Sequence, residues 1–197
     1  FQRSHNILKN FPYKIILASK SPRRQHLLKD LGFDFEVKVK EVDEVYPENL
    51  DKEKVPEYLS ELKAKAFDED LDEDHLVITA DTIVLLENRI VGKPKDEDDA
   101  IKVLEFLSGK RHEVITGVTL HNKQKLKSFS VKTSVYFKKL TSEEISFYVK
   151  NYKPLDKAGA YGIQEWIGYI GIEKIEGSYF NVMGLPVKEL YEELQIF

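Results

Sequence analysis

Residues 18–24 (ASKSPRR) combine the residue types that bind anions. They follow a short apolar run and supply two hydroxyls and three cations just before an expected helix. Ser21 is the expected cap of that helix, with Pro22 at its first position. Free N–H groups and the dipole at a helix N-terminus favour an anion, and Arg23 and Arg24 can fork onto phosphate oxygens. The stretch predicts a phosphate site; a capped helix with solvated basic residues is the alternative.

An aspartate stands inside the most strand-like stretch of the chain. Asp81 lies within the apolar run 77–84 (VITADTIV), and a buried carboxylate must be paired, metal-bound or neutralised. Held on a rigid strand, it could bind a divalent ion or accept a proton from water. Asp43 and Glu44 follow an expected strand at 35–39 and could add carboxylates to a magnesium or manganese site. The alternatives are an aspartate bonded to backbone amides and two solvated loop acids.

A glycine-rich block in the C-terminal half has the composition of a ligand-binding wall. In residues 156–164 (DKAGAYGIQ) small residues surround Tyr161 and would let a planar ligand approach the backbone. Gln164 offers both a donor and an acceptor, which suits the edge of a nucleobase. A second such block follows at 177–186 (GSYFNVMGLP).

Several other polar residues carry little information singly. The lone lysines are more often surface charges than ligands: Lys63, Lys93 and Lys157. The acidic runs 68–74 and 96–99 are assigned to structure, as a solvated link and as a helix start favoured by the dipole. The five histidines show no zinc-binding spacing. We therefore expect any metal here to be a hard ion with oxygen ligands.

Hydrophobic periodicity predicts an α/β fold whose sheet is mixed. Expected strands occupy 14–19, 35–39, 76–86, 90–91, 113–120 and 129–137. Expected helices run from Pro22 to a stop at Gly32, over 56–67, from Asp96 to Gly109, from a capping box at Thr141 and Glu144, and over 186–194. At least two strand pairs read as antiparallel hairpins.

Composition excludes whole classes of function. The 197 residues include 30 Lys+Arg against 34 Asp+Glu, a net charge of -4 that argues against coating nucleic acid or an anionic membrane. There is no cysteine, which removes disulfides, thiolate zinc sites and thiol nucleophiles and favours a reducing cytoplasm. No apolar run approaches the roughly 20 residues that span a bilayer. The absence of a GxxxxGK[ST] pattern argues against a P-loop enzyme.

Taken together, the blocks resemble the Maf family of nucleoside triphosphate pyrophosphatases. The resemblance covers about 16–194 and includes ILASKSPRRQHLL, ADTIV, GKP, LSGKRHEVITGV, PLDKAGAYGIQ and GSYFNVMGLP in that order. It implies a mixed central sheet flanked by helices, with two lobes around a cleft, formed by a single domain over 14–197. Residues 1–13 extend beyond the usual family start, as a native extension or a remainder of cloning.

The resemblance also assigns roles to individual residues. It implies cleavage between the α- and β-phosphates of a nucleotide, with a divalent metal, Mg²⁺ or Mn²⁺, held by Asp81 and Glu44. Asp81 would be the proton acceptor that activates water, and Glu44 a further acidic contributor. The positions on the phosphate side would be Ser19, Arg24, Lys63 and Lys93.

The branch of the family that takes dTTP and UTP carries SPR, ADT and GIQ, which match here at Arg23, Thr82 and Gln164. The chain therefore resembles that branch, a group of hydrolases acting on acid anhydrides, and not the branch acting on 7-methyl-GTP. Modified pyrimidine nucleotides are a further substrate class that this resemblance allows. After GIQ the sequence Glu165–Gly168 departs from the glycine-richer family pattern.

Two other functions remain open from the sequence. The first is a non-catalytic nucleotide-binding regulator of cell division on the same fold. The second is a nucleic-acid-binding domain using residues 20–24, which the charge balance disfavours. A homodimer is allowed by the resemblance, although no residues identify an interface.

Overall fold

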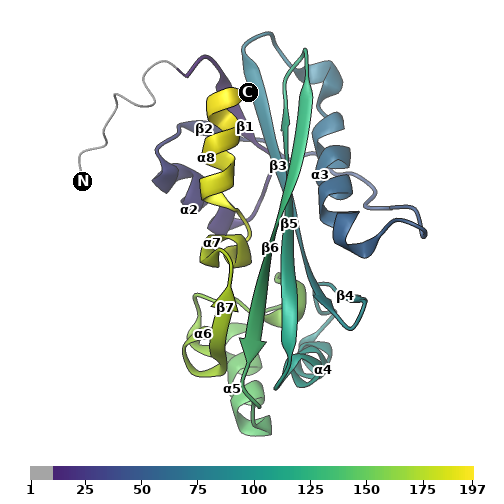
Figure 1. The fold of residues 1–197 in the computed structure, drawn as a ribbon, viewed down its shortest axis with the longest axis vertical. Coiled ribbons are helices and arrows are strands. Elements are labelled where there is room, and N and C mark those ends of the chain that lie inside the picture. Colours follow the sequence, from purple (N-terminus) through teal and green to yellow (C-terminus); the bar gives the residue numbers. More distant parts are fainter. Residues whose placement is uncertain (1–10) are drawn as a thin grey trace.

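One mixed sheet organises the protein. The computed structural model describes residues 11–197 and is shown in Figure 1. Within them the strands are β1 (Lys14–Leu17), β2 (Phe35–Val37), β3 (His75–Leu86), β4 (Arg89–Val91), β5 (Arg111–His121), β6 (Leu126–Phe137) and β7 (Ile172–Glu176). Their order is β2-β1-β3-β5-β6-β7, with β4 paired to β3. The pairs β1–β2 and β1–β3 are parallel and the others antiparallel, which confirms the expected mixed sheet.

Helices cover both ends of the long strands (Figure 1). Helices α2 (Pro22–Leu31) and α8 (Val187–Ile196) lie beside β1, and α3 (Val55–Lys65) lies along β3 and β5. The other helices are α4 (Glu97–Leu107), α5 (Ser142–Tyr152), α6 (Trp166–Gly171) and α7 (Tyr179–Met183). Single 3₁₀ turns are η1 (Lys52–Lys54), η2 (Asp68–Asp70) and η3 (Ala158–Ala160). No helix within 11–197 is long and apolar enough to cross a membrane.

Two hydrophobic clusters make the two expected lobes. One joins β1, α2 and α8 to the first half of β3 and includes the fully buried Leu28 and Leu190. The other packs α4 and α5 against the second half of β3 and includes Leu104 and Tyr148. Strands β3 and β5 contribute residues to both clusters and therefore connect the two lobes. Residues near the middle of β3 lie between the lobes.

Local signals in the sequence set most helix ends where expected. The Ser21 hydroxyl accepts the Arg24 N–H at 3.3 Å, and Gly32 stops α2 at a φ of 108°, in the left-handed region. Thr141 and Glu144 form the predicted capping box of α5. In the run 96–99, Asp96 caps α4 through the Asp99 N–H at 2.8 Å, which confirms its structural role.

Other expectations need correction. Strand β2 ends at Val37 and not at residue 39, because β1 ends at Leu17 and Lys38 N–H makes the last bond to it. Helix α6, strand β7 and the short helix α7 carried no periodic signal, since each has only five or six residues. Of the predicted 1–13 extension, residues 1–10 lie outside the described part, while Phe11 packs edge-on to Phe33 at 5.2 Å between ring centroids.

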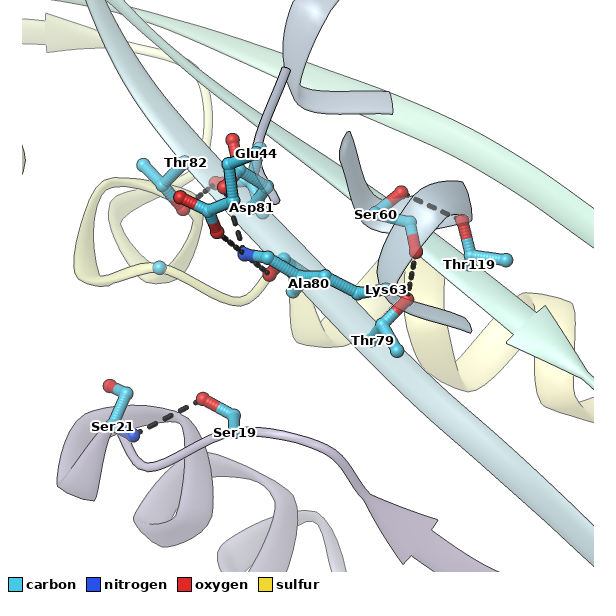
Figure 2. Close-up of polar contacts among 12 residues, drawn as sticks. Ser19, Ser21, Glu44, Ser60, Lys63, Thr79, Ala80, Asp81, Thr82 and Thr119 are labelled. Carbon is cyan, nitrogen blue, oxygen red and sulfur yellow. Dashed lines mark hydrogen bonds and ion pairs between the residues drawn. The ribbon is translucent and has the colours of Figure 1, made fainter. Parts of the chain in front are cut away.

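A glycine and several hydroxyl groups fix the position of helix α3 on the sheet. Gly117, opposite Asp81 in the β3–β5 pairing, leaves room for the backbone at the start of α3: an added Cβ would lie 2.3 Å from Glu57 N. Farther along α3, the Ser60 hydroxyl bonds to that of Thr119 at 2.7 Å, and Thr79 donates to the Ser60 carbonyl at 2.5 Å (Figure 2).

We predict that Gly117→Ala lowers the free energy of unfolding by about 1–3 kcal/mol, because the new methyl group meets backbone atoms that cannot turn away. Urea unfolding followed by circular dichroism measures the change. Gly92→Ala is the control, since a Cβ there meets no atom within 4 Å. Equal stability of the two variants would show that the start of α3 does not depend on this close approach.

Candidate active site

The nine residues to which the family resemblance gives roles all line one cavity, whereas Asp43 is not among its lining residues. Its volume is about 790 Å³, and it lies where the end of β1, the start of α2, the middle of β3 and the turn η3 meet. The predicted residues that it brings together are Ser19, Arg23, Arg24, Glu44, Lys63, Asp81, Thr82, Lys93 and Gln164. Residues separated by more than 140 positions in the chain thus share one site, which no local signal could establish.

At the floor of the cavity a lysine joins two carboxylates (Figure 2). Lys63 Nζ lies 2.9 Å from Asp81 Oδ1 and 3.1 Å from Glu44 Oε1, and it also donates to the Ala80 carbonyl at 3.4 Å. The Asp81 side chain is 13% exposed and that of Glu44 54%. The rigid strand β3 therefore presents a nearly buried carboxylate, and the loop after β2 adds an open one.

The protonation of Asp81 is set by opposing effects. Burial raises its pKa most, and the charges of Lys63 and Arg24 lower it, while the Glu44 carboxylate raises it further. The net direction is upward. A carboxylate with a raised pKa is a stronger proton acceptor than an exposed aspartate, which suits general-base chemistry.

The α2 junction forms the second wall of the cavity. Ser19 is buried, and its hydroxyl accepts the Ser21 N–H at 3.2 Å (Figure 2). Arg24 donates from Nε to the Gly184 carbonyl at 2.7 Å and from Nη2 to the Thr82 hydroxyl at 2.8 Å. Burial lowers the pKa of Arg24 to about 10, so its guanidinium is still charged at neutral pH.

The third wall comes from residues 156–164. Gln164 Oε1 is buried and has no hydrogen-bond partner among residues 11–197. The turn that carries it is held by Tyr148 of α5, whose hydroxyl donates to Glu165 Oε1 at 2.5 Å and accepts the Gly162 N–H at 3.0 Å. An unpaired buried carbonyl oxygen is costly without a ligand, so Gln164 has the chemistry of a recognition group.

The lysines flanking this wall differ in their partners. Lys157 pairs with Asp156 at 3.0 Å, and Asp156 also lies 3.5 Å from Arg23 across the cavity. Lys93 is exposed at the cavity and forms no ion pair with any described residue. The surroundings of Lys93 therefore leave its charge available to an anion.

Sequence reasoning missed a buried polar chain behind Thr82. Thr116 bonds to the Thr82 hydroxyl at 2.8 Å and donates to the Asn181 carbonyl at 3.2 Å. Both Thr116 and Asn181 are fully buried. The one available signal was the position of Asn181 inside the block 177–186, because Thr116 sits in an ordinary strand pattern.

Two other polar groups lie apart from the site chemistry. His112 is buried, burial lowers its pKa to about 3, and its Nε2 lies 2.6 Å from the Tyr161 hydroxyl. Asp72, Asp74 and His75 lie close enough to share a cation, but none of them lines the cavity that contains Asp81. Asp74 is exposed and already pairs with Lys14 at 3.3 Å.

The cavity brings together cations, the N-terminus of α2 and a paired carboxylate, an arrangement whose chemistry suits an anionic ligand. The fold is similar to the solved structure of a HAM1 protein from Coxiella burnetii, with a TM-score of 0.50 and 16% identity, covering 94% of this chain and 100% of the other. That likeness concerns the fold alone.

Sequence comparison identifies the family. Residues 14–197 match the model of the Maf-like proteins. The chain is 55% identical over 184 residues to the dTTP/UTP pyrophosphatase of Phocaeicola vulgatus, covering 93% of this chain and 95% of that one. It is 53% identical over 189 residues to the dTTP/UTP pyrophosphatase of Christiangramia forsetii, covering 96% and 95%. The protein belongs to the Maf-like family.

We predict that Lys63→Met raises the pKa of Asp81, because it removes the nearest positive charge from a carboxylate already disfavoured by burial. The carbon-13 shift of the Asp81 carboxyl, followed against pH, reports the change. Lys93→Met removes the same charge type elsewhere in the cavity and should leave the titration in place. A titration of Asp81 unaltered in Lys63→Met would refute the control of Asp81 by this lysine.

Proposed function

We propose that this protein hydrolyses dTTP and UTP, and modified pyrimidine triphosphates of similar shape, to the nucleoside monophosphate and pyrophosphate. The observation that carries the proposal is the Asp81–Lys63–Glu44 cluster facing the α2 N-terminus within one cavity. The names of relatives 53–55% identical over most of the chain support the same substrates.

The reaction assigns a task to each wall. Water attacks the α-phosphorus in line with the bond to the β-phosphate: the new P–O bond forms, that bond breaks, and the water proton passes to Asp81. The raised pKa of Asp81 favours this transfer, and Lys63 holds the side chain in place. The leaving pyrophosphate carries the developing negative charge, which Arg24, Lys93 and the α2 N-terminus would stabilise.

The donor set fits a hard divalent ion. The second carboxylate oxygens of Asp81 and Glu44 make no hydrogen bond within residues 11–197, and both residues line the cavity. One or two carboxylates completed by substrate phosphates and water are the usual protein environment of Mg²⁺. Asp81 and Glu44 would hold Mg²⁺ or Mn²⁺, whose chemical contribution is to neutralise phosphate charge.

Electrostatics explains why the site needs such local cations. A nucleoside triphosphate brings several negative charges to a chain whose own net charge is -4. Ser19, Arg23 and Lys93 lie on the cavity surface and can meet these charges directly.

Selection of the base is proposed for Gln164, Thr82 and Arg23. Gln164 lines the cavity, and its Oε1 has no hydrogen-bond partner within residues 11–197, so the side-chain amide can offer an acceptor to a base edge. Thr82 lies on β3, bonded to Arg24, and lines the same cavity as Gln164. The relatives' substrate names support the assignment to uracil and thymine.

We further propose a reducing cytoplasm as the location of the protein, which the absence of cysteine favours. Residues 14–197 would form a single domain, and two copies would form a homodimer. The charge balance argues against a nucleic-acid partner. A non-catalytic regulator of cell division is the other candidate, and nucleotide binding without turnover would favour it.

We predict that Asp81→Asn abolishes pyrophosphate release from dTTP and UTP, because the amide cannot accept the water proton. The substitution should leave the protein folded, since an amide of equal size can still accept the hydrogen bond from Lys63 Nζ. A coupled pyrophosphate assay with Mg²⁺ or Mn²⁺ and thermal unfolding check both statements. Turnover equal to that of the unaltered protein would refute the role of Asp81. An unaltered protein that binds both nucleotides and turns over neither would overturn the proposed function.

We predict that Gln164→Ala and Thr82→Ala mainly change the choice of nucleotide, because each removes a polar group at the cavity surface that takes no part in proton transfer. The measurement is kcat/KM across dTTP, UTP, CTP, GTP and 7-methyl-GTP. Lys157→Ala serves as a control from the same wall. Ratios between nucleotides that stay constant in both variants would contradict the role in base selection.

A further inference from the structure

The hydrogen bonds behind Thr82 form a chain with a defined beginning and end. It begins at Arg24 Nη2, 2.8 Å from Thr82 Oγ1, continues over 2.8 Å to Thr116 Oγ1, and ends at the Asn181 carbonyl, 3.2 Å away. Thr82 and Thr116 are direct partners in the β3–β5 pairing, so the sheet itself sets their spacing.

The chemistry of the two ends imposes a direction on the protons. A guanidinium can only donate and a backbone carbonyl can only accept, while each threonine hydroxyl has a single hydrogen. Every contact of the chain holds a hydrogen only when Thr116 donates to the Asn181 carbonyl, because the carbonyl offers none in return. In that arrangement Thr82 donates its own hydrogen to Thr116 and accepts from Arg24.

Further hydrogen bonds fix the position of Asn181 at the end of the chain. Asn181 is fully buried, and its side-chain Nδ2 donates to the carbonyls of Val114 at 3.2 Å and Val131 at 3.0 Å. Its backbone carbonyl also accepts the Gly184 N–H at 3.0 Å. Gly184 in turn accepts from Arg24 Nε, which closes the set of contacts around the guanidinium.

Thr82 is thus left with no hydrogen to offer a ligand and with one free lone pair. We propose that Thr116 is a positioning residue that makes Thr82 a hydrogen-bond acceptor only, so that the nucleotide group facing Thr82 is a donor. Uracil and thymine present N3–H, whereas the N3 of cytosine is an acceptor and would meet Thr82 with two lone pairs in opposition. The choice of nucleotides here rests on the proposed function.

The inference predicts a loss of selectivity when Thr116 loses its hydroxyl. In Thr116→Val the Thr82 hydrogen is released and can turn toward the cavity, where it can donate to an acceptor. The matched control is Thr116→Ser, which keeps the hydroxyl and the chain. The probes are α,β-methylene-UTP and α,β-methylene-CTP, whose dissociation constants are measured by titration calorimetry.

We expect Thr116→Val to reduce the preference for the uracil analogue by about five- to tenfold and Thr116→Ser to keep it within about twofold. In a Thr82→Val background, Thr116→Val should change the preference less than twofold, because its route through Thr82 is gone. An unchanged preference in Thr116→Val, an equal effect in both backgrounds, or an unaltered protein without preference would each overturn the proposal.

A second measurement does not depend on a variant that folds. Neutron diffraction from deuterated crystals of the unaltered protein locates the hydroxyl deuterons directly, and the expected result is a Thr82 deuteron directed at Thr116. A Thr116 deuteron directed at Thr82 would overturn the proposal. Binding selectivity and pyrophosphate release are separate readouts, so a protein that binds selectively without turnover would refute the proposed hydrolysis and leave the role of Thr116 standing.

Discussion

The ion pair between Lys63 and Asp81 is the interaction on which the rest of the site depends. A carboxylate in the middle of a buried strand is unfavourable unless a charge or hydrogen bond offsets its desolvation, and Lys63 provides both at 2.9 Å. The same ammonium also pairs with Glu44, which comes from the loop between β2 and η1. One lysine thereby sets both the position and the charge balance of the two carboxylates.

This requirement explains features of the fold that lie away from the cavity. Lys63 reaches Asp81 because α3 approaches β5 closely at Gly117, the partner of Asp81 on the neighbouring strand. Hydrogen bonds among the buried residues Ser60, Thr79 and Thr119 also set the position of α3 (Figure 2). Hydroxyl bonds between a helix and a sheet are directional, whereas apolar packing alone tolerates small shifts. Placement of the cation therefore relies on polar contacts inside an otherwise apolar interface.

Buried polar contacts also fix the side chains on the other walls of the cavity. Tyr148 of α5 holds the turn that carries Gln164, and the chain from Arg24 to Asn181 holds Thr82. Tyr148, Thr116 and Asn181 do not line the cavity, but they fix the positions of residues that do. The site thus consists of side chains facing the ligand and of buried partners that determine their direction.

The sequence by itself determined the α/β class, the caps at Ser21 and Thr141, and the identity of the chemically capable residues, because these depend on local periodicity and on side-chain type. It also contained the family resemblance, since six ordered blocks carry it. Only the tertiary structure decided that Lys63 joins Asp81 to Glu44 and that Thr116 stands behind Thr82. Those contacts follow from strand pairing and helix placement between distant segments, and a buried threonine in a strand has the same sequence pattern whether it bonds to a functional residue or merely fills the sheet.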